Sequence, residues 1–184
     1  QEAVGLHQRG QLDEAAVLYQ EILKAAPTTA DALLNYSTIL AQRGQLETAE
    51  TLLKRLVAVA PKFAYGHYAY ANVLHAQKKY RDAAAEYHSA IALDPSPADF
   101  HHNEGVNHDA LGDEDASIAS YRRAIATQSG SPLSYFNCGV VLQRQGKKQE
   151  ALEAYDAAIA RVADFADAHL NRTMVLNDLF RFED

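Results

Sequence analysis

Apolar residues recur along this chain three and four residues apart, and polar residues fill the positions between them, which is the spacing of amphipathic α-helices. The pattern repeats every 34 residues, as the prolines at positions 27, 61 and 95 show. If places within each repeat are counted from Ala30, place eight is always small and place twenty-four is always large. The sequence therefore predicts helix pairs in tandem, each burying its apolar stripe against the next.

Turn residues divide each repeat at fixed places. Place fifteen carries a glycine, which ends a helix in the left-handed conformation at little cost, except where Lys78 stands. Proline closes the second helix, because the residue before it avoids helical torsion angles. The proline place becomes Ser129 and then Ala163 in the later repeats. Small residues at places eight and twenty allow the two helices to approach closely.

Period, turn glycine, small residues, aromatic place and closing proline together resemble the tetratricopeptide repeat, over the whole chain. The resemblance implies an all-α, right-handed superhelical solenoid of about 11 antiparallel helices. We expect a single array, and its end at FRFED predicts that the natural protein continues. The expected parts are a truncated repeat at 1–29, complete repeats at 30–63, 64–97, 98–131 and 132–165, and a half repeat at 166–184 that acts as a cap.

Composition narrows the partners and the compartment. The net charge is -7 and the basic residues are scattered, so no stripe is present that would neutralise nucleic-acid phosphates. No apolar run approaches the roughly 20 residues that span a bilayer, and we expect no membrane partner. The single cysteine, Cys138, stands at a core place and fits the reducing cytoplasm. The opening 27 residues resemble the first repeat of bacterial proteins, so we expect a bacterial cytoplasmic protein.

A ladder of asparagines marks the candidate binding surface. The resemblance implies that first helices line a concave groove that holds peptides or other proteins. Place six of the successive repeats is Asn35, Ala69, Asn103, Asn137 and Asn171. An asparagine amide both donates and accepts, so it can pair with the main chain of an extended peptide. The ladder resembles that of O-linked N-acetylglucosamine transferases, where it holds substrate polypeptides; alternatively, these asparagines cap or brace neighbouring helices.

Further groove residues are expected around the ladder. Aromatic groups at places two and five suit side-chain pockets, although ordinary helix packing is the alternative. Asn72 lies one turn beyond Ala69, and Arg144 is the cation at a concave place. Some proteins of this family bind the carboxylate tail of a partner through a clamp of lysine and arginine side chains. Here Asp31, Asp99 and Asp167 stand at places where that clamp needs cations, so an uncharged or mildly basic peptide is favoured. The predicted peptide-binding residues are Asn35, Tyr65, Tyr68, Asn72, His102, Asn103, Phe136, Asn137, Arg144 and Asn171.

A second cluster faces the core. His101, Glu104 and His108 share one helical face that should be buried. A zinc site and acid-base catalysis are two interpretations, but the histidines are about 10 Å apart along the axis and open onto no cleft. We favour a third, in which one or two histidines hold the buried carboxylate. It predicts that this repeat is the least stable, above all between about pH 5 and 7.

No nucleophile with a base, phosphate loop or metal set is found, so we expect neither catalysis nor a cofactor. The favoured function is a non-catalytic scaffold that binds a protein or extended peptide of unknown identity. One alternative is the substrate-recognition arm of a larger O-linked N-acetylglucosamine transferase-like enzyme. Another is a self-associating scaffold, in which the incomplete terminal repeats stack end to end.

Overall fold

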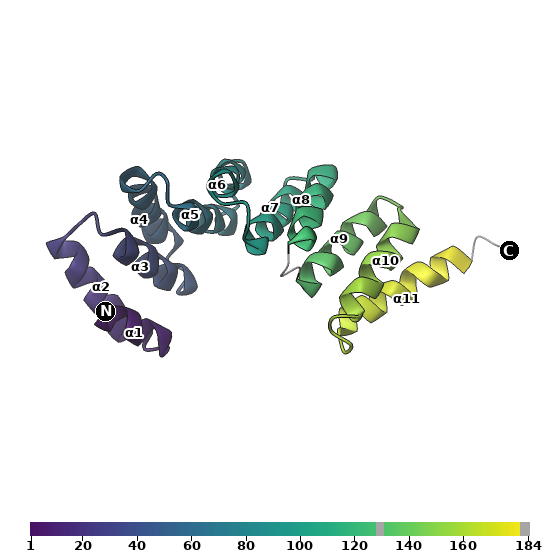
Figure 1. Cartoon of the computed structure of the whole chain (residues 1–184), viewed down its shortest axis with the longest axis horizontal. Helices are drawn as coiled ribbons and strands as arrows, with labels where there is room; N and C mark the ends of the chain where they lie inside the picture. Colours follow the sequence, from purple (N-terminus) through teal and green to yellow (C-terminus); the bar gives the residue numbers. More distant parts are fainter. Residues whose placement is uncertain (128–130, 181–184) are drawn as a thin grey trace. The chain divides into compact units, whose positions relative to one another are not determined.

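The computed structural model describes residues 1–127 and 131–180, in which every regular element is an α-helix (Figure 1). This confirms the all-α prediction and, within the described residues, the number of eleven helices. The helices are α1 (Glu2–Gln8), α2 (Leu12–Ala25), α3 (Ala30–Gln42), α4 (Leu46–Val59), α5 (Ala64–Ala76), α6 (Tyr80–Leu93), α7 (Ala98–Ala110), α8 (Glu114–Ala126), α9 (Pro132–Arg144), α10 (Lys148–Ile159) and α11 (Ala166–Phe180).

The helices form two compact units, Gln1–Asp94 and Pro95–Asp184. Within each unit every helix packs against the next one along the chain, from α1 to α6 and from α7 to α11. In addition α3 contacts α5 and α9 contacts α11, so these first helices lie beside one another. Each unit is therefore a short solenoid in which the second helices support a face made by first helices.

The turns within the helix pairs are left-handed, as the sequence predicts. Glycine at place fifteen has φ values between 72° and 79° at positions 10, 44, 112 and 146. Lys78, the exception in the sequence, has φ 62° and adopts the same turn. Its backbone N–H donates to the His75 carbonyl at 2.8 Å, as the N–H of Gly112 does to Asp109 at 2.9 Å. Ser129 and the last four residues of the predicted cap lie outside the described residues.

Close helix approach depends on the small residues of place eight. A Cβ added to Gly105 would lie 2.8 Å from the Tyr121 ring, and one added to Gly139 would lie 2.7 Å from Tyr155. These tyrosines are buried, 2% and 0% exposed, and they fill the space that the glycines leave. The large residue of place twenty-four is thus buried between the two helices of its pair. No helix among the described residues is long and apolar enough to cross a membrane.

Candidate peptide-binding face

In the second unit, place-six asparagines interact with tyrosines of the preceding helix pair. Asn137 on α9 lowers the pKa of the Tyr121 hydroxyl on α8, and Asn171 on α11 lowers that of the Tyr155 hydroxyl on α10. Burial is the larger effect on Tyr121, and it raises the pKa of that hydroxyl to about 12. The asparagines therefore brace neighbouring repeats, as the alternative interpretation of the ladder expects.

Bracing does not use the whole amide. The Tyr155 hydroxyl donates to Gln143 Oε1 at 2.7 Å, and the Asn171 amide lowers the pKa of that hydroxyl, as an N–H group facing its oxygen does. This interaction involves one N–H group, and an asparagine carries a second N–H group and a carbonyl oxygen. Asn171 and Asn137 are half-buried, so part of each residue remains exposed to solvent on its first helix.

The first unit uses its asparagines differently. Asn35 Nδ2 donates to the carbonyl of Asp31 in its own helix at 2.8 Å, while the Tyr19 hydroxyl is buried without a partner among the described residues. Asn72 Oδ1 accepts a hydrogen bond of 2.7 Å from the Tyr87 hydroxyl. Asn72 belongs to place nine, so the same kind of pair is formed within one repeat.

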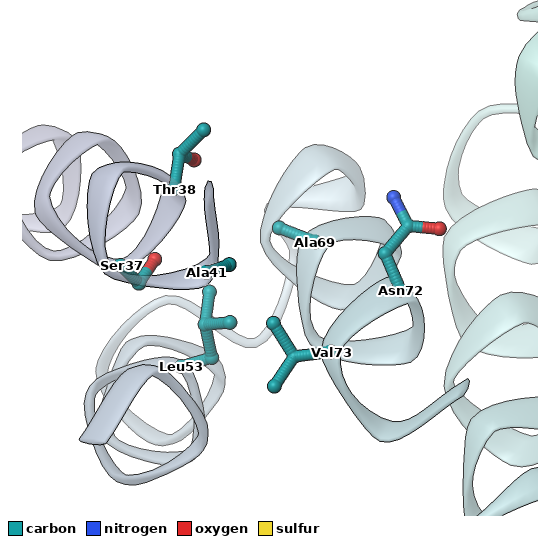
Figure 2. Close-up of a pocket in the computed structure, with 7 residues that line it drawn as sticks. All are labelled: Ser37, Thr38, Ala41, Leu53, Ala69, Asn72 and Val73. Atoms are coloured by element: carbon teal, nitrogen blue, oxygen red, sulfur yellow. The ribbon is translucent and has the colours of Figure 1, made fainter. Parts of the chain in front are cut away.

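One helix layer lacks both members of the pair. Leu53 on α4 occupies the tyrosine place, and Ala69 on α5 occupies the asparagine place of the next repeat. Both residues line one pocket of about 110 Å³ between α3, α4 and α5 (Figure 2). The loss of a tyrosine hydroxyl and of its amide partner thus coincide, and the space that the two side chains would fill is open.

Place-five rings lie against the buried tyrosines of their own repeats. The ring centroids are 6.2 Å apart for Tyr68 and Tyr87, and 5.5 Å apart for His102 and Tyr121. The Phe136 ring lies 5.9 Å from that of Tyr155. These place-five side chains are half-buried and contribute to packing, whereas Tyr65 at place two is 50% exposed.

Arg144 is already paired within the second unit. Its guanidinium at the end of α9 bonds to Asp109 on α7 and to Glu114 on α8. These carboxylates raise the pKa of Arg144, and they neutralise the cation that the sequence places in the groove. Asp99 and Asp167, at place two of the same unit, are exposed. The face is therefore acidic on balance.

The face with His101, Glu104 and His108 is buried as predicted, but the partners of Glu104 are not those expected. His101 and Glu104 are 5% and 7% exposed, and His108 is half-buried. Glu104 Oε2 accepts from Ser120 Oγ at 2.7 Å and lies 3.4 Å from the Arg123 guanidinium. The prediction that histidines hold this carboxylate was therefore wrong, because the facing helix α8 supplies both donors.

The place-four histidines have a structural role that the spacing did not reveal. His101 Nε2 donates to the carbonyl of Pro95 at 2.9 Å, six residues earlier. His67 makes the equivalent bond to Pro61 at 3.0 Å, and His169 makes it to Ala163 at 2.8 Å. Each ring ties a first helix to the loop before it. No group of histidine, cysteine or acidic side chains in the described part of the chain is arranged to hold a metal ion.

His102 and Cys138 are two further titratable residues of the second unit whose pKa values are shifted by burial. His102 Nδ1 lies 2.8 Å from the hydroxyl of Ser134, and burial lowers the histidine pKa although Asp99 opposes the change. Cys138 is buried, and burial raises the pKa of its thiol. A raised pKa keeps the thiol protonated and unreactive, in agreement with its expected place in the core.

Left-handed turns, small-to-tyrosine contacts and consecutively packed helix pairs define an α-solenoid repeat protein. Family models described as tetratricopeptide repeat match residues 6–73 in one case, and residues 68–132 and 139–181 in another. The chain therefore belongs to the tetratricopeptide-repeat family, and the resemblance seen in the sequence is confirmed. None of the curated proteins matches the chain.

Several solved structures share the fold at low sequence identity. A crystal structure of MamA is 24% identical with a TM-score of 0.80, over 87% of this chain and 94% of that one. A thermophilic repeat protein of Thermus thermophilus is 22% identical with a TM-score of 0.71, over 95% of each chain. YrrB, described as having an unusual peptide-binding site, is 19% identical with a TM-score of 0.73, over 85% of this chain and 81% of its own.

Proposed function

We propose that this chain is a non-catalytic scaffold that binds an extended peptide segment of a partner protein. The binding surface is the face of the first helices, with Asn103, Asn137 and Asn171 as its main-chain contacts in the second unit. Tetratricopeptide-repeat proteins generally serve as non-catalytic scaffolds, and YrrB is a fold relative with a peptide-binding site.

The observation that carries this proposal is the tyrosine contact behind Asn137 and Asn171. Each amide interacts with a buried tyrosine hydroxyl, and this contact restricts the side chain before a ligand binds, so less side-chain entropy is lost on binding. The 34-residue period sets such amides at the same height in successive first helices. An extended strand presents carbonyl and N–H groups at regular intervals, and an ordered row of amides can accept and donate to them.

Charge selects among peptides. Asp99 and Asp167 are exposed at place two, and the charge of Arg144 is already balanced by Asp109 and Glu114. An acidic ligand would meet like charge on this face. A peptide with uncharged or basic side chains near the amides is therefore the favoured ligand.

A second candidate function, self-association, rests on one face of α11. Leu170 and Met174, one helical turn apart, are 61% and 51% exposed. Pairing of this face with a second copy would bury both side chains. Sedimentation of the chain and of Leu170→Glu/Met174→Glu across concentration tests it, and a wild-type chain that stays monomeric at high concentration excludes it. The other alternative, a substrate-recognition arm of a larger glycosyltransferase, stays a prediction.

The test of peptide binding separates the amides from the tyrosines behind them. Blocked ten-residue peptides would be selected from a random library on the immobilised chain and measured by calorimetry. The triple variant Asn103→Ala/Asn137→Ala/Asn171→Ala should lose binding. Tyr121→Phe/Tyr155→Phe keeps the amides but frees them, and it should weaken binding less.

Circular dichroism of each variant shows whether the fold is intact. Gln149→Ala serves as the matched control, because Gln149 is an exposed amide on the second helix α10. Peptides that bind the folded triple variant as tightly as the wild type would exclude the ladder as the binding surface.

A further inference from the structure

The pocket between α3, α4 and α5 has a specific origin in the sequence. Other layers are built on a tyrosine with a nearby asparagine, such as Tyr155 with Asn171. Here the tyrosine place is Leu53 and the asparagine place is Ala69. Two smaller side chains leave about 110 Å³ open, whereas protein interiors are normally close-packed.

The walls of the pocket are apolar in effect. Figure 2 shows Leu53 and Val73 pointing into the space, with Ala41 of α3 facing it from the other side. The hydroxyls of Ser37 and Thr38 also line it, but both already donate to the carbonyl of Leu34, at 2.7 and 2.9 Å. The walls therefore offer few hydrogen-bonding groups to a polar ligand or to an ordered water molecule.

The pocket opens on the candidate binding face. In this family the places that face the groove are two, five, six, nine, twelve and thirteen of each repeat. Thr38, Ala41, Ala69 and Asn72 stand at four such positions, at places nine, twelve, six and nine of their repeats. Asn72 lies at the pocket edge, and the Tyr87 hydroxyl bonded to its Oδ1 holds the amide in place. An amide beside an apolar notch is suited to a peptide residue whose main chain meets the amide and whose side chain enters the notch.

We propose that this pocket binds one branched aliphatic side chain, of leucine, isoleucine or valine, from an extended peptide lying on the first unit. The inference rests on the proposed peptide-binding function and adds its specificity. An apolar cavity of about 150 Å³ holds a benzene ring, so a space of about 110 Å³ suits an aliphatic side chain better than an aromatic one.

The surrounding charge fits the same ligand. The structure describes all residues of α3 and α5. If histidine is left aside, Asp31 at place two of α3 is the only acidic or basic side chain at their groove places, and it is exposed. An aliphatic residue flanked by uncharged or basic residues therefore meets no like charge, whereas an acidic flank would. The peptide expected here is apolar at one position and neutral or basic beside it.

A small probe tests the pocket without any peptide. N-acetyl-leucinamide titrated into the chain should shift the methyl signals of Ala41, Ala69 and Val73 in ¹H–¹³C spectra, with a dissociation constant in the roughly millimolar range. N-acetylglycinamide, which has the same main chain and no side chain, should leave them unmoved. Methyl signals that do not respond to the leucine compound would overturn the proposal.

Filling the pocket is the second arm. Leu53→Tyr/Ala69→Asn restores the pair of the other layers, and Ala69→Leu fills the space from one wall in case the double variant fails to fold. Either should abolish the leucinamide shifts at the remaining pocket methyls, and should weaken selected peptides with an aliphatic residue at the sensitive position roughly 10- to 100-fold. Ala85→Leu, at an exposed position of α6, is the control and should change neither.

The two arms distinguish failure of this inference from failure of the proposed function. Peptides that need the asparagines but ignore the filled pocket would refute the pocket alone. Leucinamide binding in the pocket, with no peptide recovered from the library, would refute peptide binding and leave the pocket standing.

Discussion

Ser120 Oγ donates a hydrogen bond of 2.7 Å to the carboxylate of Glu104, and both residues are buried. Removal of that donor by Ser120→Ala leaves the carboxylate with Arg123, 3.4 Å away. An unsatisfied buried acceptor costs about 1–3 kcal/mol, so the free energy of unfolding should fall by that amount. Urea unfolding followed by circular dichroism measures the change.

The matched variant for this bond removes both partners. Ser120→Ala/Glu104→Met should recover most of the loss, because an apolar pair of similar shape requires no hydrogen bond. Substitutions at ordinary surface positions change the free energy of unfolding by less than about 0.5 kcal/mol. A decrease smaller than that for Ser120→Ala would contradict the prediction.

Gly139 and Gly5 should respond to alanine with opposite signs. A methyl group at Gly139 would lie 2.7 Å from the Tyr155 ring, whereas one at Gly5 meets only the end of the Arg9 side chain at 3.4 Å. Overpacking costs about 1–3 kcal/mol and alanine gains about 1 kcal/mol in a helix. Gly139→Ala should therefore lower the melting temperature and Gly5→Ala should raise it. A higher melting temperature for Gly139→Ala would show that the ring can move aside.

Replacement of Lys78 by glycine should increase the stability of the first unit. Its φ of 62° is costly for a residue with a Cβ, by roughly 1–2 kcal/mol, and its side chain is exposed. Lys78→Gly should stabilise the first unit by about 1 kcal/mol after the entropy of glycine is subtracted. Lys78→Ala keeps the Cβ and should give no such gain. Equal unfolding free energies for the two variants would show that the backbone here is unstrained.

Stability of the second unit should fall as the pH falls below about 6.5, the ordinary histidine pKa. Burial lowers the pKa of His102 in the folded state, so the unfolded chain takes up the proton first. Stability therefore rises with pH between the folded and unfolded pKa values, and its full value is reached above the unfolded one. Hydrogen exchange between pH 5 and 8 should show protection in residues 98–127 falling first.

The control for the pH dependence compares two histidines. His102→Phe should flatten the dependence of stability on pH even if it lowers stability throughout, since Ser134 loses its partner. His88→Gln, at an exposed position, should leave the slope unchanged. Protection that is uniform in all repeats at every pH would contradict the prediction.

The period of the sequence predicted the helices because helix ends and close contacts depend on residues at fixed places. Gly105 and Gly139 were recognisable as sites of close approach, and the left-handed turns followed from place fifteen. The turn persists even at Lys78, which has a Cβ and still adopts φ 62°.

The partners of polar side chains were harder to predict, because they depend on which facing helix lies within reach. Glu104 was assigned to histidines of its own helix, but Ser120 and Arg123 come from α8. The asparagine ladder was recognised in the sequence, but its contacts with the tyrosines of place twenty-four were not predicted. A signal for the pair was present, since Leu53 and Ala69 change together where the other repeats have tyrosine and asparagine.

The contact between Tyr121 and Asn137 joins a second helix to the first helix of the following repeat. A duplication that starts and stops between repeats can therefore separate matched partners and join a tyrosine to an alanine, or a leucine to an asparagine. In the second unit the exchangeable module is therefore not the helix pair but the segment from one left-handed turn to the next, whereas the bond between Tyr87 and Asn72 in the first unit lies within one helix pair. Recombination and repeat shuffling should preserve compatibility when they cut at the turn glycines.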